Sequence, residues 1–174
     1  MIFELLILTI VPSLFLLLYF VKSDKFPEPP SMILKTVVLG IIIGFPAGYL
    51  NSLIIKDINF SFLAAVVEEP LKFSVLYLYI KKQKYFDEPI DGIVYGACAS
   101  LGFATFENLF YVFSHVESIE KSFVIAGLRS ISAVPMHAMC GAIMGCHFGQ
   151  YIFKKKKNPT IFKFFHSNYF SWYL

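Results

Sequence analysis

The chain has 174 residues, of which 57% are hydrophobic and only 16% are charged, with a formal net charge of +3. Soluble domains usually contain about 45–50% apolar and about 25% charged residues, so this composition excludes an ordinary soluble domain. It also excludes a disordered chain, and the three cysteines show no spacing typical of a disulfide scaffold or a zinc site. The length allows about five or six helices of ~20 residues, enough to cross a membrane several times.

Five apolar runs follow one another along the chain, each long enough to cross a hydrocarbon core of about 30 Å. Each run must be helical, because an open strand would leave its backbone groups unpaired in lipid. We therefore predict an all-α, polytopic transmembrane bundle over residues 1–153, followed by a basic tail over residues 154–174. The expected spans are residues 2–21, 32–55, 60–80, 90–113 and 131–153.

Basic side chains predict the orientation of these spans. Lysines are concentrated after the first, third and fifth runs, and the last group is the tetrad Lys154–Lys157. The positive-inside rule then places the N-terminus outside and the tail in the cytoplasm. The first run lacks a basic n-region and a small-residue cleavage site, so we interpret it as a retained span. These features predict a multi-pass protein of a bacterial-type cell membrane.

Glycines recur every four residues in three of the runs. This spacing places them on one face of a helix, where they let two helix backbones approach closely. We expect a tight bundle whose polar side chains face inward. The repeated glycines are Gly40, Gly44 and Gly48, then Gly92 and Gly96, then Gly141, Gly145 and Gly149.

Several polar side chains lie at depths where charges are costly. A carboxylate near the bilayer centre costs at least ~2.5–3.5 kcal/mol, so a functional site is the first hypothesis for such groups. At 1.5 Å per residue, Glu68, Glu107 and His137 lie ~18, ~25 and ~24 Å from the cytoplasmic ends of their spans. This agreement predicts one site, reached from the extracytoplasmic side. The candidate residues are Glu68, Glu69, Glu107 and His137, supported by Lys72 and Asn108.

The residue types at this depth predict acid–base hydrolysis. Lys72 falls between Glu68 and Glu69 on the helix surface and can compensate one of them, which leaves the other as a general base for water. His137 can stabilise an oxyanion or orient the water, and Asn108 can donate to a carbonyl oxygen. Alternatively, a buried Glu–Lys pair can serve only helix packing.

A divalent metal is a further alternative, with Glu68, Glu69, Glu107 and His137 as candidate ligands. The sequence has no HExxH spacing, so the ligands would come from three helices. No other cofactor is predicted.

Three segments of the chain resemble the PrsW family of glutamate-type intramembrane proteases. They are VVEEPLKF (66–73), FDEPIDGIVYGACASLGFATFENLFY (86–111) and RSISAVPMHAMCGAIMG (129–145). The Glu-Pro of the first loop is also similar to the family's, and the resemblance covers about residues 5–153. The family is related to CAAX-prenyl proteases and bacteriocin-processing proteins.

The resemblance implies an intramembrane endopeptidase with water activated by glutamates. It implies that the substrate is a membrane-tethered protein such as an anti-sigma factor, cut on its extracytoplasmic side in site-1-type regulated proteolysis that releases a stress response. The expected partners are this substrate and the lipid bilayer, with no nucleic acid. The residues that match family motifs are Glu68, Glu69, Glu107, Asn108 and His137, and Glu88 matches an acidic position of less defined role.

The end of the chain departs from the family pattern. Family members usually continue with further helices that carry a second histidine motif, of the form His-Gly-x-Tyr-Asp, which residues 158–174 lack. We therefore expect a C-terminally shortened member. The alternative function is a non-catalytic membrane protein, either a proton-coupled transporter, since buried Glu and His groups also make relays, or a degenerate substrate-binding or immunity module.

Overall fold

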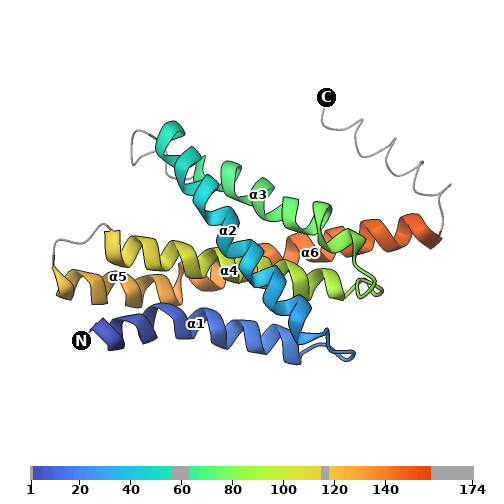
Figure 1. Cartoon of the computed structure of the whole chain (residues 1–174), viewed down its shortest axis with the longest axis horizontal. Helices are drawn as coiled ribbons and strands as arrows, with labels where there is room; N and C mark the ends of the chain where they lie inside the picture. Colours follow the sequence, from blue (N-terminus) through green and yellow to red (C-terminus); the bar gives the residue numbers. More distant parts are fainter. Residues whose placement is uncertain (1, 56–62, 115–117, 158–174) are drawn as a thin grey trace.

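The computed structural model describes residues 2–55, 63–114 and 118–157, and within these ranges the chain forms helices and no strand. This confirms the predicted all-α fold. The helices pack into one bundle (Figure 1). Their bounds are α1 Ile2–Lys22, α2 Pro30–Ile54, α3 Ala64–Leu78, the 3-10 helix η2 Ile80–Lys82, α4 Asp91–Ser114, α5 Ile119–Ile131 and α6 Ala133–Lys157.

Four stretches of the described residues are long and apolar enough to cross a membrane: Ile2–Lys22, Pro30–Ile54, Asp91–Phe113 and Ile119–Lys154, the last of which joins α5 and α6. The chain is therefore a multi-pass membrane protein. The expected span 60–80 contains α3, whose 15 residues extend for only ~22 Å. Residues 60–62 of that span lie outside the described residues.

The region between the fourth and fifth expected spans corrects the sequence prediction. We expected a loop there, but it contains helix α5, whose first turn is capped by the Ser118 hydroxyl accepting from the Lys121 amide at 3.4 Å. The helix was missed because its 13 residues are too few to cross a bilayer and Glu120 and Lys121 interrupt its apolar pattern. The expected span 131–153 is consequently divided at Ser132 between α5 and α6.

The boundary of the expected tail also differs from the prediction. Helix α6 continues through Lys157, so the lysine tetrad is helical rather than the start of a tail. Continuation of the helix satisfies the backbone N–H groups of the tetrad within the helix ladder. The rest of the predicted tail, residues 158–174, lies outside the described residues.

Helix α4 forms the centre of the bundle (Figure 1). It packs against α1, α2 and α6, and α2 crosses it obliquely. Within their most apolar windows, 67% of the α4 residues are buried in the protein, against 17% for α1 and α2. The α1–α2 and α3–α4 connections and the end of α6 lie at one end of the bundle, and the start of α5 lies at the other. Polar side chains on α4 are therefore shielded from lipid by neighbouring helices.

The glycines of α4 and α6 allow these two helices to touch through their backbones. A Cβ atom added at Gly145 would overlap the carbonyl oxygen of Gly92, and one added at Gly96 would overlap that of Gly141. The predicted close packing is thus present between α4 and α6. Gly48 differs from the expected pattern, because a Cβ there would meet nothing within 4 Å.

Substituting Gly145 with alanine should destabilise the bundle, while the same change at Gly48 should not. The added methyl group at Gly145 meets backbone, which cannot rotate away, and overpacking of this kind typically costs about 1–3 kcal/mol. Thermal unfolding in detergent micelles measures the difference. Equal melting temperatures for Gly145→Ala and Gly48→Ala would show that the backbone contact does not limit stability.

Candidate functional site

Three predicted site residues from three different helices meet inside the bundle. Glu68 of α3, Glu107 of α4 and His137 of α6 each offer one ligand atom, and these atoms lie within 4.8 Å of one another. Glu68 and His137 are buried, and Glu107 is partly buried. We call this group the glutamate–histidine cluster. The proximity agrees with the shared depth estimated from the sequence.

A buried lysine connects this cluster to the second glutamate of α3. Lys72 is fully buried, and its Nζ atom donates to Oε1 of Glu69 at 2.8 Å and lies 3.7 Å from Oε2 of Glu68. The ammonium also lies over the Phe103 ring, 4.4 Å from its centroid. The sequence placed Lys72 between the two carboxylates, and the structure has the same arrangement. Glu69 lies at the edge of this group, with a side chain that is 35% exposed.

The lysine also determines how the histidine is protonated. Lys72 Nζ lies 2.9 Å from His137 Nδ1, and His137 Nε2 lies 3.0 Å from Oε2 of Glu107. An ammonium can only donate, so Nδ1 accepts and the ring proton resides on Nε2, which donates to Glu107. The Phe103 ring packs beside the imidazole, with centroids 5.6 Å apart. The tautomer and orientation of His137 are therefore set by its neighbours.

An arginine on α5 completes the polar network. Arg129 donates from its terminal guanidinium nitrogen to Oε2 of Glu107 at 2.5 Å and from Nε to Oδ1 of Asn108 at 2.6 Å. Its guanidinium also lies 4.3 Å from the centroid of the Tyr111 ring. Arg129 and His137 therefore contact the same oxygen of the Glu107 carboxylate.

Asn108 has a different environment from the one expected. It is fully buried, accepts from Arg129, and donates from Nδ2 to the Thr9 carbonyl oxygen of α1 at 3.5 Å. The sequence suggested that this amide donates to a substrate carbonyl. In the structure its contacts instead orient Arg129, and through it Glu107.

Two further residues contact the cluster, and sequence reasoning did not select them. Arg129 lies in the third resembling segment. A guanidinium near an apolar span is as costly as a carboxylate, and this cost is the signal that could have identified Arg129. Asn51 of α2 donates from Nδ2 to Oε1 of Glu68 at 3.0 Å, and a lone asparagine near a helix end gave no comparable signal. Glu88 lies away from the cluster, where its backbone amide donates to Oδ2 of Asp91 at 2.7 Å.

The donor chemistry of the cluster fits a divalent metal ion. Two carboxylates and one imidazole converge from three helices, and such a mixed oxygen and nitrogen set suits Zn²⁺ or Mn²⁺. Among the described residues, Lys72 and Arg129 are the lysine and arginine side chains that pair with Glu68, Glu69 and Glu107, so the carboxyl groups outnumber these cations by one. Glu69, also a predicted ligand, lies outside the set that converges and contacts Lys72 instead.

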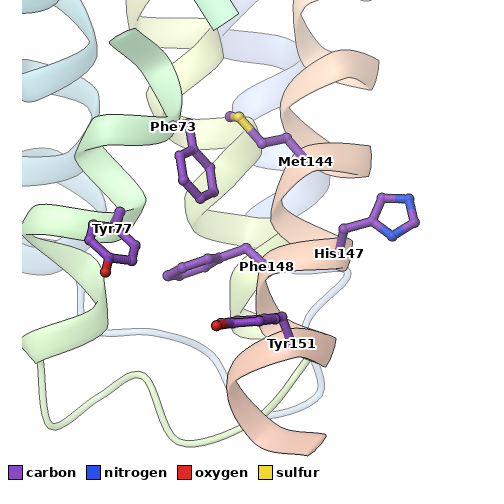
Figure 2. Close-up of a pocket in the computed structure, with 6 residues that line it drawn as sticks. All are labelled: Phe73, Tyr77, Met144, His147, Phe148 and Tyr151. Carbon is purple, nitrogen blue, oxygen red and sulfur yellow. The ribbon is translucent and has the colours of Figure 1, made fainter. Parts of the chain in front are cut away.

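An apolar cleft of about 530 Å³ lies between α3 and α6 (Figure 2). The Phe73 ring meets the Phe148 ring edge-on at 5.6 Å, and Phe73 directly follows Lys72 in the sequence. The His147 ring points away from the aromatic rings in Figure 2. The cleft thus begins next to the polar network. Its lining residues are Phe73, Tyr77, Met144, His147, Phe148 and Tyr151.

Comparison with known proteins connects this chain to a protease family. A family model described as "PrsW family intramembrane metalloprotease" matches residues 28–173. Protease PrsW of Bacillus subtilis is 37% identical over 156 residues, which cover 85% of this chain and 69% of that protein. Protease PrsW of Geobacillus kaustophilus is 34% identical over 163 residues, or 89% of this chain and 70% of that protein.

A further relative is less similar in sequence. Protease PrsW of Clostridioides difficile is 31% identical over 166 residues, covering 89% of this chain and 69% of that protein. No solved structure matches the chain. The resemblance stated for the three segments is therefore confirmed over most of the sequence, and the chain belongs to the PrsW family of intramembrane proteases.

Proposed function

We propose that the chain is an endopeptidase that hydrolyses a membrane-tethered protein, with Glu69 as the general base. The observation that supports this proposal is the convergence of Glu68, Glu107 and His137 beside Glu69 inside an apolar bundle. Glu69 is the more exposed of the paired glutamates, so water and a substrate can reach it while Glu68 stays buried. Its carboxylate takes a proton from water as the oxygen attacks the scissile carbonyl carbon, and later returns the proton to the leaving amine.

We further propose that Glu68, Glu107 and His137 hold a divalent metal ion, for which Nε2 of His137 would give up the proton that it donates to Glu107. When bound, such an ion supplies Lewis-acid polarisation of the substrate carbonyl. Asn51 orients Glu68 by donating to its Oε1 atom, and Arg129 orients Glu107. Partners of this kind fix ligand geometry, and their loss typically costs about 10–100-fold in metal affinity. Lys72 orients Glu69 by donating to its Oε1 atom at 2.8 Å.

The substrate that we propose is a tethered protein such as an anti-sigma factor, cut on the extracytoplasmic side. The concentration of lysines at the opposite end of the spans supports this orientation. The apolar cleft between α3 and α6 suits the membrane segment of such a substrate, because the mostly aromatic side chains that line the cleft can pack against an apolar helix. Phe73, which lines the cleft, lies four positions, or about one helical turn, from Glu69 on α3.

Co-reconstitution of the purified chain with a tethered reporter in vesicles tests the proposed function. We expect a single cleavage product, and cysteine labelling from each side of the vesicle should place the cut on the side opposite the lysine-rich ends. Reporter binding without any cleavage would contradict the proposal and favour a binding module. Solute flux driven by a pH gradient would favour a transporter.

Removal of metal should abolish this cleavage without unfolding the bundle. We expect activity to fall to background after dialysis against a strong chelator and to return on addition of Zn²⁺ or Mn²⁺, because the cluster supplies donors suited to these ions. Metal content is followed by mass spectrometry, and helicity is followed by circular dichroism. Full activity at background metal content would contradict the metal assignment while leaving the Glu69 assignment intact.

A further inference from the structure

A second group of buried carboxylates lies at the other end of α4. Asp24 and Glu28, from the α1–α2 connection, meet Asp91, the first residue of α4, with one ligand oxygen from each within 4.8 Å of the others. All three residues are at least nine-tenths buried. We call this group the acidic cluster. Asp91 and Glu107 are separated by 16 positions on α4, a rise of ~24 Å, so the acidic cluster is distinct from the glutamate–histidine cluster.

The hydrogen bonds of the acidic cluster leave one fully buried oxygen, Oδ2 of Asp24, without a partner. Asp91 Oδ2 accepts from the backbone amides of Asp87 and Glu88 at 2.9 and 2.7 Å. The Tyr95 hydroxyl donates to Glu28, and the Phe26 amide donates to Asp24 Oδ1 at 3.1 Å. Asp24 Oδ2 is buried and has no hydrogen-bond partner. A buried carboxylate oxygen in this state is costly, and a bound cation is one of the few groups that satisfies it.

The charge of the acidic cluster is also uncompensated. Among the described residues, no lysine, arginine or histidine forms an ion pair with any of its three carboxylates. The nearby Lys25 instead lies over the Phe26 ring, 5.7 Å from its centroid. Burial raises the pKa of Glu28 to about 7, and repulsion from Asp91 and Asp24 adds to this shift. The fold thus places three acids together without a protein cation to balance them.

We propose that Asp24, Glu28 and Asp91 bind a hard divalent cation, of the class of Mg²⁺, Mn²⁺ or Ca²⁺, at a site separate from the proposed active site. A donor set made only of carboxylate oxygens suits these ions and disfavours softer metals such as Zn²⁺ or Cu⁺. The cation would join the α1–α2 connection to the first turn of α4, two segments that lie more than sixty positions apart. It thereby ties α1 and α2 to the central helix at this end of the bundle.

Cation titrations of the full-length chain in detergent micelles, after complete metal removal, test this proposal. Mn²⁺ binding followed by electron paramagnetic resonance should show a site that Mg²⁺ or Ca²⁺ displaces. Asp24→Asn should weaken this site at least tenfold, whereas His137→Ala should leave it unchanged. Glu120→Gln is the matched control, because it removes an exposed carboxylate near the start of α5, at the other end of the bundle from the acidic cluster.

The melting temperature supplies a second measurement, because the difference between Asp24→Asn and the wild type should differ between the metal-free and the Mg²⁺-bound protein. Without metal, Asp24→Asn should melt at a higher temperature than the wild type, because it removes a buried charge that has no partner. With saturating Mg²⁺, the wild type should gain stability and Asp24→Asn should not. Equal responses of the two proteins to the cation would overturn the proposal. An absence of any cation effect on the wild type would also overturn it and indicate that the carboxylates share protons instead.

Discussion

Replacing Glu69 with glutamine is expected to reduce cleavage of a tethered reporter by ~10²–10⁴-fold, the usual contribution of a general base. Glutamine keeps the shape of the side chain and an oxygen that accepts from Lys72, so the bundle should fold normally. It cannot take a proton from water. The reduction should appear in kcat, while the amount of bound metal stays at the wild-type level.

Glu68→Gln separates the two glutamates. Under the proposed mechanism this variant loses both activity and bound metal, because Glu68 belongs to the set of converging ligands. Glu120→Gln is the control, because it changes an exposed carboxylate on α5 away from the cluster. Wild-type turnover by Glu69→Gln, or loss of metal from it, would reject Glu69 as the general base.

Replacing Lys72 with methionine should have the largest effect on stability. The ammonium is fully buried and serves Glu69, Glu68 and His137 at once. Methionine fills a similar volume but leaves Glu69 and Nδ1 of His137 without their donor and Glu68 without its neighbouring cation. Removal of one partner from a buried ion pair typically costs about 3–5 kcal/mol. Thermal unfolding in the presence of a chelator measures this loss.

Lys35→Met is the matched control for this substitution. Lys35 is an exposed lysine on α2, where such a change should alter the free energy of unfolding by about 0.5 kcal/mol or less. Adding Glu68→Gln to Lys72→Met should cost less than the sum of the two single changes, because the two side chains interact. Full additivity, or a Lys72→Met protein as stable as the wild type, would show that the ammonium does not neutralise these acids.

Much of the helix layout was predictable from the sequence because lipid imposes a single rule on every span. An apolar run of about 20 residues must be helical, and the ends of α1, α2 and α4 accordingly lie within two residues of the expected spans. Counting residues along the spans that contain Glu68, Glu107 and His137 also predicted that these three residues lie at a similar depth, and in the structure they lie together. Depth in a membrane is one coordinate that sequence position determines almost directly.

The features that the sequence did not reveal depend on tertiary contacts. Helix α5 is too short and too polar to show the signature of a span, so its role in presenting Arg129 to Glu107 could not be foreseen. The acidic cluster was similarly hidden. Asp91 alone is typical of a helix N-terminus, where negative charge is favoured. Only the folded connection between α1 and α2 brings Asp24 and Glu28 to it.

The central position of α4 has a consequence for how the protein enters the membrane. This helix carries Asp91, Glu107 and Asn108 and is the least apolar of the four candidate spans. Alone in lipid it would expose these groups at a cost of several kcal/mol. Because α1 and α2 are more apolar and are synthesised first, they can already reside in the bilayer when α4 leaves the ribosome. Insertion of α4 then depends on the surface that α1 and α2 already present in the bilayer. Mutations of α1 or α2 residues that face α4 would therefore first reduce the insertion of α4.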